Sequence, residues 1–121
     1  MTGTSALNHV HLSGRISADP QVLALPSGDE IVTFRLVVER DAAARKRSKQ
    51  SVDTIECVAW AARIRRSVAR LRADEQVEVQ GALRRRFSRG GAGVQSFASV
   101  EVTSVVALGP AAPKERRPAR R

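Results

Sequence analysis

The chain is poor in cysteine and in acidic residues, and both shortages narrow what it can be. Its 121 residues include one cysteine, Cys57, so no internal disulfide can form and nothing indicates an oxidising compartment. No apolar run approaches the ~18 residues of a membrane span, and no apolar signal region opens the chain, so we expect a soluble protein without a membrane partner. Twelve acidic residues stand against 21 lysines and arginines, and the net charge of +9 indicates a polyanionic partner.

Catalytic motifs are missing as well. The sequence contains no P-loop, no Gly-x-Ser-x-Gly and no metal-ligand cluster. His9 and His11 would share one strand face, but no Cys, Asp or Glu in that segment completes a zinc shell. Cys57 has the inward parity of its strand, which favours a small buried hydrophobe over a nucleophile. Asp53 and Glu56 are three apart on a strand, hence on opposite faces. We therefore expect no enzyme activity, no metal site and no cofactor.

The predicted fold is organised around residues 51–83. Residues 54–60 alternate as a strand, and residues 61–72 then change to a helical period, with an apolar stripe among arginines. Residues 76–87 return to a period of two, and Gly81 within them indicates a bulge where the sheet curls. A short helix that bridges two strands of a small β domain is typical of an OB-fold, a five-stranded Greek-key barrel. We thus predict an all-β protein with one short helix.

Flanking strands complete this barrel. Residues 8–16 and 31–39 alternate between apolar and polar positions, and Gly14 indicates a bend or a close backbone approach. Residues 94–108 require an irregularity after Val102 to keep their apolar side chains together, Phe97 and Leu108 among them. Turn residues bracket a short apolar piece at 22–25.

The chain divides into two parts. Residues 1–109 form the predicted OB domain, and residues 110–121 hold Pro, Ala, Lys and Arg without any core-forming residue. Such a composition predicts a disordered basic tail.

Outward-facing basic and aromatic residues form the candidate binding site. Trp60 has the outward parity of its strand, although a lone tryptophan is commonly a core residue, so both placements stay open. An exposed ring beside arginines would make a platform on which bases stack between phosphate contacts. Residues 40–51 are strongly basic and are interpreted as a flexible finger for phosphates rather than as a merely solvated loop. The predicted DNA-binding residues are Trp60, Arg35, Arg84, Arg86, Phe87 and Arg15, together with Arg45, Lys46, Arg47 and Lys49 on the finger.

In this order and spacing, several short motifs resemble the bacterial single-stranded DNA-binding proteins (SSB) over residues 8–108. The matching pieces are Asn8-x-Val10-x-Leu12-x-Gly14-Arg15, Asp19-Pro20, Phe34-x-Leu36, Cys57-Val58-Ala59-Trp60, the Arg-rich helix and Val77-x-Val79-x-Gly81-x-Leu83. The resemblance implies an OB-fold that binds and protects single-stranded DNA without sequence preference in replication, recombination and repair. It also implies a homotetramer, with a dimer as the alternative, and a cytoplasmic, nucleoid-associated location.

The match is uneven at the residues that such proteins use. Trp60 matches an aromatic stacking position, and Arg84 and Arg86 match basic ones, whereas Thr54 and Ala42 stand where aromatic rings are common. Phe87 is one residue early for a third ring, and it faces inward unless the strand bulges. The basic tail replaces the acidic peptide with which housekeeping members recruit other enzymes, which implies an accessory, phage or plasmid version. Because only 3% of the residues are aromatic, arginine is expected to carry more of the affinity.

Two alternatives stay open. An OB module that binds RNA is one, because stacking and phosphate contacts do not distinguish the sugars without a group that contacts the 2′-hydroxyl. A protein-interaction subunit of a replication or primosome complex is the other, and the missing aromatic positions favour it. The arginines on the predicted face and on the finger oppose that second alternative.

Overall fold

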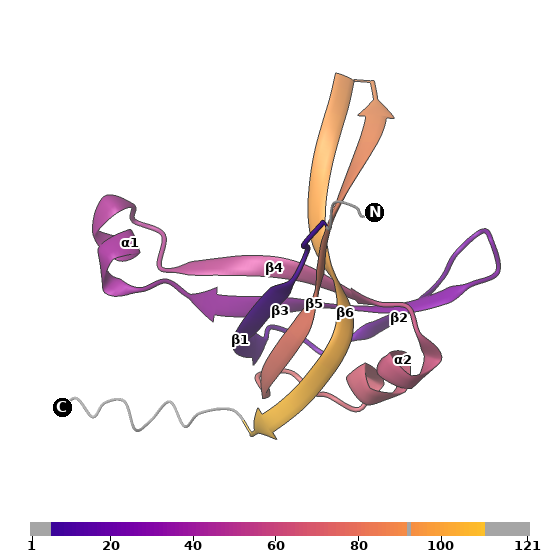
Figure 1. The fold of residues 1–121 in the computed structure, drawn as a ribbon, viewed down its shortest axis with the longest axis horizontal. Coiled ribbons are helices and arrows are strands. Elements are labelled where there is room, and N and C mark those ends of the chain that lie inside the picture. Colours follow the sequence, from indigo (N-terminus) through magenta and orange to yellow (C-terminus); the bar gives the residue numbers. More distant parts are fainter. Residues whose placement is uncertain (1–5, 92, 111–121) are drawn as a thin grey trace.

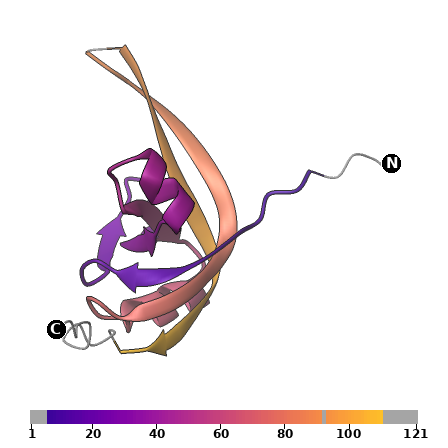
Figure 2. The same ribbon diagram turned by 90° about the vertical axis from the view of Figure 1, so that its left-hand side faces the viewer.

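A single closed barrel is the centre of the computed structural model, which describes residues 6–91 and 93–110 (Figures 1 and 2). The predicted tail falls outside these residues, apart from Pro110. The elements in chain order are β1 (Val10–Ile16), β2 (Gln21–Ala24), β3 (Glu30–Glu39), α1 (Ala42–Arg47), β4 (Val52–Ala59), α2 (Ala62–Ala69), β5 (Gln76–Gly90) and β6 (Gly93–Gly109).

The strands form one sheet in the order β1-β5-β6-β4-β3-β2. The sheet closes on itself because the end of β1 also pairs with β3, Arg15 opposite Val37 and Ile16 opposite Leu36. Strand β4 runs parallel to β6, and the other pairings are antiparallel. This arrangement confirms the predicted all-β class and the OB-fold.

Alternation along the strands fills the barrel interior. The inward residues of β3, β4, β5 and β6 are buried, and the apolar stripe of α2 (Ile64 and Val68) with Leu71 covers one end of the core. The predicted helical stripe is therefore confirmed. The largest fully buried side chains are Ile16, Leu36, Val68, Val77, Val79, Val100 and Cys57.

Close backbone contacts explain two of the glycines. A Cβ atom on Gly81 would lie 2.0 Å from the carbonyl oxygen of Glu101, and one on Gly14 would lie 2.2 Å from that of Val37. Beside Gly81 the pairing slips, since Gln80 faces Ser104 but Gly81 faces Val102, which leaves Thr103 as the extra residue on β6. The predicted irregularity after Val102 and the predicted bulge at Gly81 are thus one feature.

The structure adds two elements to the prediction. Residues 21–24 form the sixth strand, β2, which pairs with β3 at the edge of the sheet. Part of the predicted flexible finger is the short helix α1, because Asp41 caps its N-terminus by accepting a hydrogen bond from the Ala44 amide at 2.8 Å. The alanines after the cap favour helix, a signal that the charge of the segment obscured. Neither α1 nor α2 is long and apolar enough to cross a membrane.

Candidate nucleic-acid interface

Trp60 lies outside the core. Its side chain follows β4 directly and is 45% exposed, whereas its neighbour Ala59 is fully buried. The alternation of β4 produces this difference, because Cys57 and Ala59 already supply the inward positions of the strand. The ring is therefore available to a ligand at the point where β4 leads into α2.

Ion pairs occupy two of the arginines on the outer face of the sheet. Arg35 of β3 lies opposite Glu56 of β4, with 3.4 Å between Arg35 Nε and Glu56 Oε1. Arg84 of β5 contacts Glu101 of β6 at 2.9 Å, and Glu101 in turn lies beside Val58 of β4. Exposed pairs of this kind are worth little to folding, so these guanidinium groups can exchange a carboxylate for a phosphate at low cost.

The long β5–β6 hairpin projects from the barrel as an arm, the tall pair of orange strands in Figure 1. Arg86 lies opposite Phe97, and its guanidinium sits 5.4 Å from the centre of the Phe97 ring. The ring is 44% exposed. Because opposite residues share a face, Arg84, Arg86 and Phe97 lie on the outer face of the arm.

Phe87 lies on the other face of the arm. No register shift occurs between Arg84 and Phe87, so Phe87 keeps the inward parity that Leu83 shares with buried Val100. It is nevertheless 65% exposed, because the arm extends past the barrel, and Arg85 lies 5.3 Å from its ring centre. The sequence thus placed Phe87 correctly by parity, but it grouped Phe87 with Arg84 and Arg86, from which the structure separates it.

Phe97 is the residue that the sequence argument missed. The sequence predicts that it supplies apolar contacts together with Leu108, yet Phe97 lies exposed beneath Arg86, and Leu108 is exposed as well. The hairpin sequence contains a signal for this pairing. If Gly90 lies opposite Gly93 at the turn, counting away from the turn along β5 and β6 places Arg86 opposite Phe97. Nothing in the sequence predicts how far the arm extends beyond the barrel.

The basic finger between β3 and β4 is anchored at its base. Arg40 donates two hydrogen bonds to the Asp53 carboxylate, at 2.8 and 3.0 Å, and its amide donates to the Ser51 carbonyl at 2.9 Å. These hydrogen bonds hold the pKa of Asp53 below its usual value and raise that of Arg40. The finger is therefore a capped helical turn on a closed base, shown at the left of Figure 1, and not a free loop.

Within the finger, the cations differ in their partners. Arg45 lies 3.5 Å from Glu39. Within the described part of the chain, Lys46, Arg47 and Lys49 have no acidic partner within 4.0 Å. Arg45, Lys46 and Arg47 occupy the last turn of α1, where the helix dipole favours positive charge.

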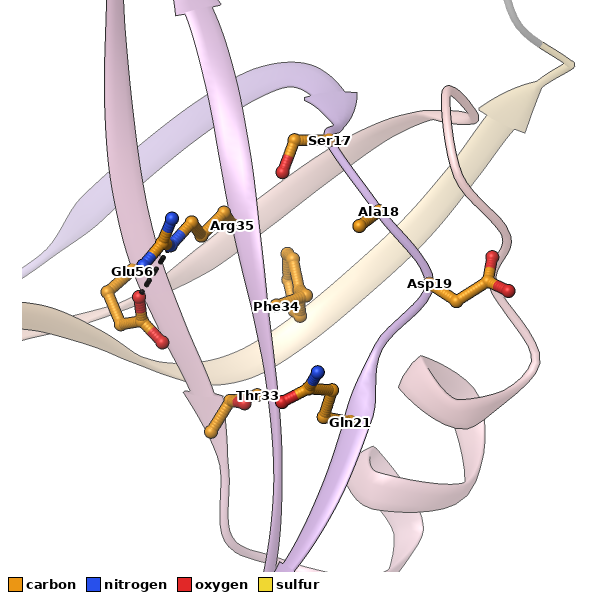
Figure 3. Close-up of a pocket in the computed structure, with 8 residues that line it drawn as sticks. All are labelled: Ser17, Ala18, Asp19, Gln21, Thr33, Phe34, Arg35 and Glu56. Carbon is orange, nitrogen blue, oxygen red and sulfur yellow. Dashed lines mark hydrogen bonds and ion pairs between the residues drawn. The ribbon is translucent and has the colours of Figure 1, made fainter.

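A shallow hollow of about 310 Å³ lies beside the Arg35–Glu56 pair (Figure 3). Its wall comes from the turn after β1, from outer positions of β2 and β4, and from three consecutive residues of β3, of which Phe34 is buried. Hydrogen-bonding groups predominate in the lining, which is Ser17, Ala18, Asp19, Gln21, Thr33, Phe34, Arg35 and Glu56. The hollow therefore offers polar contacts next to a guanidinium group.

Arg15 lies apart from the arm. It closes the barrel opposite Val37 and contacts Asp74 at 3.5 Å. On β5 it faces Gln76, eight residues and about 26 Å of strand from Arg84. The structure thus places Arg15 where β1 meets β3, away from Arg84 and Arg86.

No group of three or more possible metal ligands occurs among residues 6–91 and 93–110. His9 contacts Gln80 at 3.0 Å, and His11 contacts Glu78, both across the β1–β5 pairing. Burial raises the pKa of the Cys57 thiol to about 12, which suits an unreactive core residue.

Comparison with known proteins gives consistent matches. The model of the single-strand binding protein family matches residues 7–107. A single-stranded DNA-binding protein of Bacillus cereus is 33% identical over 101 residues, which cover 84% of this chain and 56% of the relative. Single-stranded DNA-binding protein A of Bacillus subtilis is 30% identical and covers 86% of this chain and 60% of the relative. The chain therefore spans little more than half the length of these curated relatives.

Among solved structures, one titled Plasmodium falciparum SSB complex with ssDNA has a similar fold. The TM-score is 0.75 at 22% sequence identity, and the match covers 88% of this chain and 99% of the other. At that identity the likeness concerns the fold alone.

Proposed function

Because the chain belongs to the single-strand binding protein family, we propose that it binds single-stranded DNA without sequence preference and does not act as an enzyme. The strand would lie on the outer face of the sheet, between the finger and the arm. Phosphate contacts would come from Arg35, Arg84 and Arg86 and from the finger cations Arg45, Lys46, Arg47 and Lys49. In the cell, such binding would protect exposed strands during replication, recombination and repair.

One observation carries this proposal: two aromatic rings with outward parity, Trp60 and Phe97, are exposed, and the Phe97 ring lies under an arginine. Trp60 follows β4, whose outer face carries the Arg35–Glu56 pair, and Phe97 lies under Arg86 on the arm. Stacking on an exposed ring tolerates every base, because every base has a flat face. Exposed rings on a basic surface therefore suit a ligand whose sequence varies.

The fluorescence of Trp60, the only tryptophan, tests the proposal directly. Saturating poly-dT should quench the emission, and the Trp60→Ala variant should bind about 5- to 150-fold more weakly, from a stacking loss of roughly 1–3 kcal/mol. Since the ring is about half exposed, the same variant should stay folded in circular dichroism. A folded Trp60→Ala protein with full affinity would remove Trp60 from the interface.

Titrations with RNA, duplex DNA and acidic proteins separate the alternatives. Equal affinity for single-stranded RNA would favour an RNA-binding OB module, since no group that contacts a 2′-hydroxyl has been identified. Absence of binding to any nucleic acid at low salt would favour an adaptor that contacts acidic proteins. We expect single-stranded DNA to bind most tightly and duplex DNA most weakly.

We further propose that the protein is a homotetramer, with a dimer as the alternative. Val10 to Ser13 of β1 pair only with β5 among the described residues, so the other edge of this segment is open to a second copy. Several apolar side chains elsewhere on the surface are also exposed, including Leu83, Val106 and Leu108. Sedimentation at micromolar concentration checks this: a species of only 13.1 kDa would refute it.

A further inference from the structure

Helix α2 carries more positive charge than its place in the barrel requires. Five arginines and no acidic residue occur between residues 61 and 73. Arg65 contacts Glu30 of β3 at 3.4 Å, and Arg72 donates to backbone carbonyls at the end of the helix. The remaining three are Arg63, Arg66 and Arg70.

These three arginines form one stripe on the outside of the helix. Spacings of three and four residues place them on one side, away from the buried Ile64 and Val68. All three are exposed, and none has an acidic partner within 4.0 Å among residues 6–91 and 93–110. We call Arg63, Arg66 and Arg70 the arginine stripe.

The stripe destabilises the helix that carries it. Like charges three and four residues apart repel each other. Arg63 also lies in the first turn, where the helix dipole disfavours a cation, and no side chain caps that end. The buried apolar side chains on the opposite side hold α2 in place, so the helix does not need the arginine stripe for its stability. A bound polyanion would relieve the repulsion.

We propose that the arginine stripe binds the phosphate backbone of a single strand that continues past Trp60, so that the interface extends from the sheet around the end of the barrel. This inference rests on the proposed function. Continuity favours DNA over an acidic protein, because α2 begins two residues after Trp60 and follows directly from β4 (Figure 1). The arm and the finger lie on other sides of the barrel, so the stripe would serve a separate stretch of the same strand.

Strands of two lengths distinguish binding at the arginine stripe from binding on the sheet. A single OB-fold occupies roughly 4–16 nucleotides, so an oligo-dT of about 8 should fill the sheet site alone, and one of about 30 should also reach α2. The test compares the wild type with R63Q/R66Q/R70Q on both lengths over a range of salt. The matched control, R63K/R66K/R70K, keeps the charge at the same positions.

With the long strand, the glutamine variant should lose three phosphate contacts, each of which contributes about 0.7 to the salt slope, so the slope should be shallower by about 2. The variant should also bind about 100-fold more weakly at 0.1 M salt. Its affinity for the short strand should stay within about twofold, and the lysine variant should behave as the wild type on both. Equal losses on the two lengths, or no loss on either, would overturn the proposal.

Arginine modification provides a second measurement on the unaltered protein. Treatment with phenylglyoxal, followed by mass spectrometry, should show Arg63, Arg66 and Arg70 protected by the long strand and not by the short one. Modification of all three at an unchanged rate under the long strand would overturn the proposal even if the variants misfold. Failure of the wild type to bind single-stranded DNA of either length would instead refute the proposed function, so the two failures are distinguishable.

Discussion

The arm offers a matched comparison between two phenylalanines, and it tests the orientation of the bound strand. Phe97 and Phe87 belong to the same hairpin, are both exposed and each lies about 5 Å from an arginine, but they lie on opposite faces. If the strand follows the outer face, Phe97→Ala should remove a stacking contact worth roughly 1–3 kcal/mol, a loss of about 5- to 150-fold in affinity. Phe87→Ala should change affinity by less than about twofold.

Stability should respond to both changes alike. Truncation of a fully buried Phe costs about 3–5 kcal/mol. Phe97 is 44% exposed and Phe87 65%, so we expect costs of about 2 and 1–2 kcal/mol respectively. Both variants should therefore melt a few degrees lower than the wild type and still be folded at 25 °C. A difference in binding cannot then arise from a difference in folding.

Anisotropy of a labelled oligo-dT, titrated at several salt concentrations, measures the effect. Neither change removes a charge, so both salt slopes should match that of the wild type. The Arg86→Ala and Arg86→Ala/Phe97→Ala variants complete a double-mutant cycle. If Phe97 only positions Arg86, its truncation will have no effect once Arg86 is absent. An effect of Phe87→Ala equal to or larger than that of Phe97→Ala would refute the assignment of the outer face.

Two further predictions concern acidic residues. Glu101→Gln should release Arg84 from its 2.9 Å ion pair. The salt slope of DNA binding should then steepen by about 0.7, and binding should tighten by up to about fivefold at 0.1 M salt. Weaker binding would contradict the exchange of the Glu101 carboxylate for a phosphate. The second prediction concerns pH. Asp53 has a lowered pKa because Arg40 donates hydrogen bonds to it. The ionised Asp53 therefore stabilises the folded protein above the unfolded pKa of about 3.9, and this stabilisation is lost as pH falls through the lower folded pKa. Melting temperatures between about pH 5 and pH 2 should therefore fall less in Asp53→Asn than in the wild type, and parallel curves would argue against this linkage.

The sequence by itself determined the barrel and much of the surface that faces outward. Alternation placed Cys57 inside and made the outward parity of Trp60 visible, and the helical stripe led to the buried Ile64 and Val68. The bulge beside Gly81 was also predictable, because the apolar positions of β6 change parity after Val102. These features are local, since the period of a strand or helix acts over a few neighbouring residues.

Only the tertiary structure decided how outward residues meet. The hairpin turn predicts which residues of β5 and β6 lie opposite each other, but the contact of Arg84 with the diagonal Glu101 and the exposure of Phe97 beneath Arg86 depend on the folded sheet. The exposure of Phe87 depends on how far the arm reaches past the barrel, because inward parity buries a side chain only where a core lies opposite. Helix α1 depended on one capping hydrogen bond, which the Ala44 amide donates to Asp41, within a segment whose charge indicated a loop.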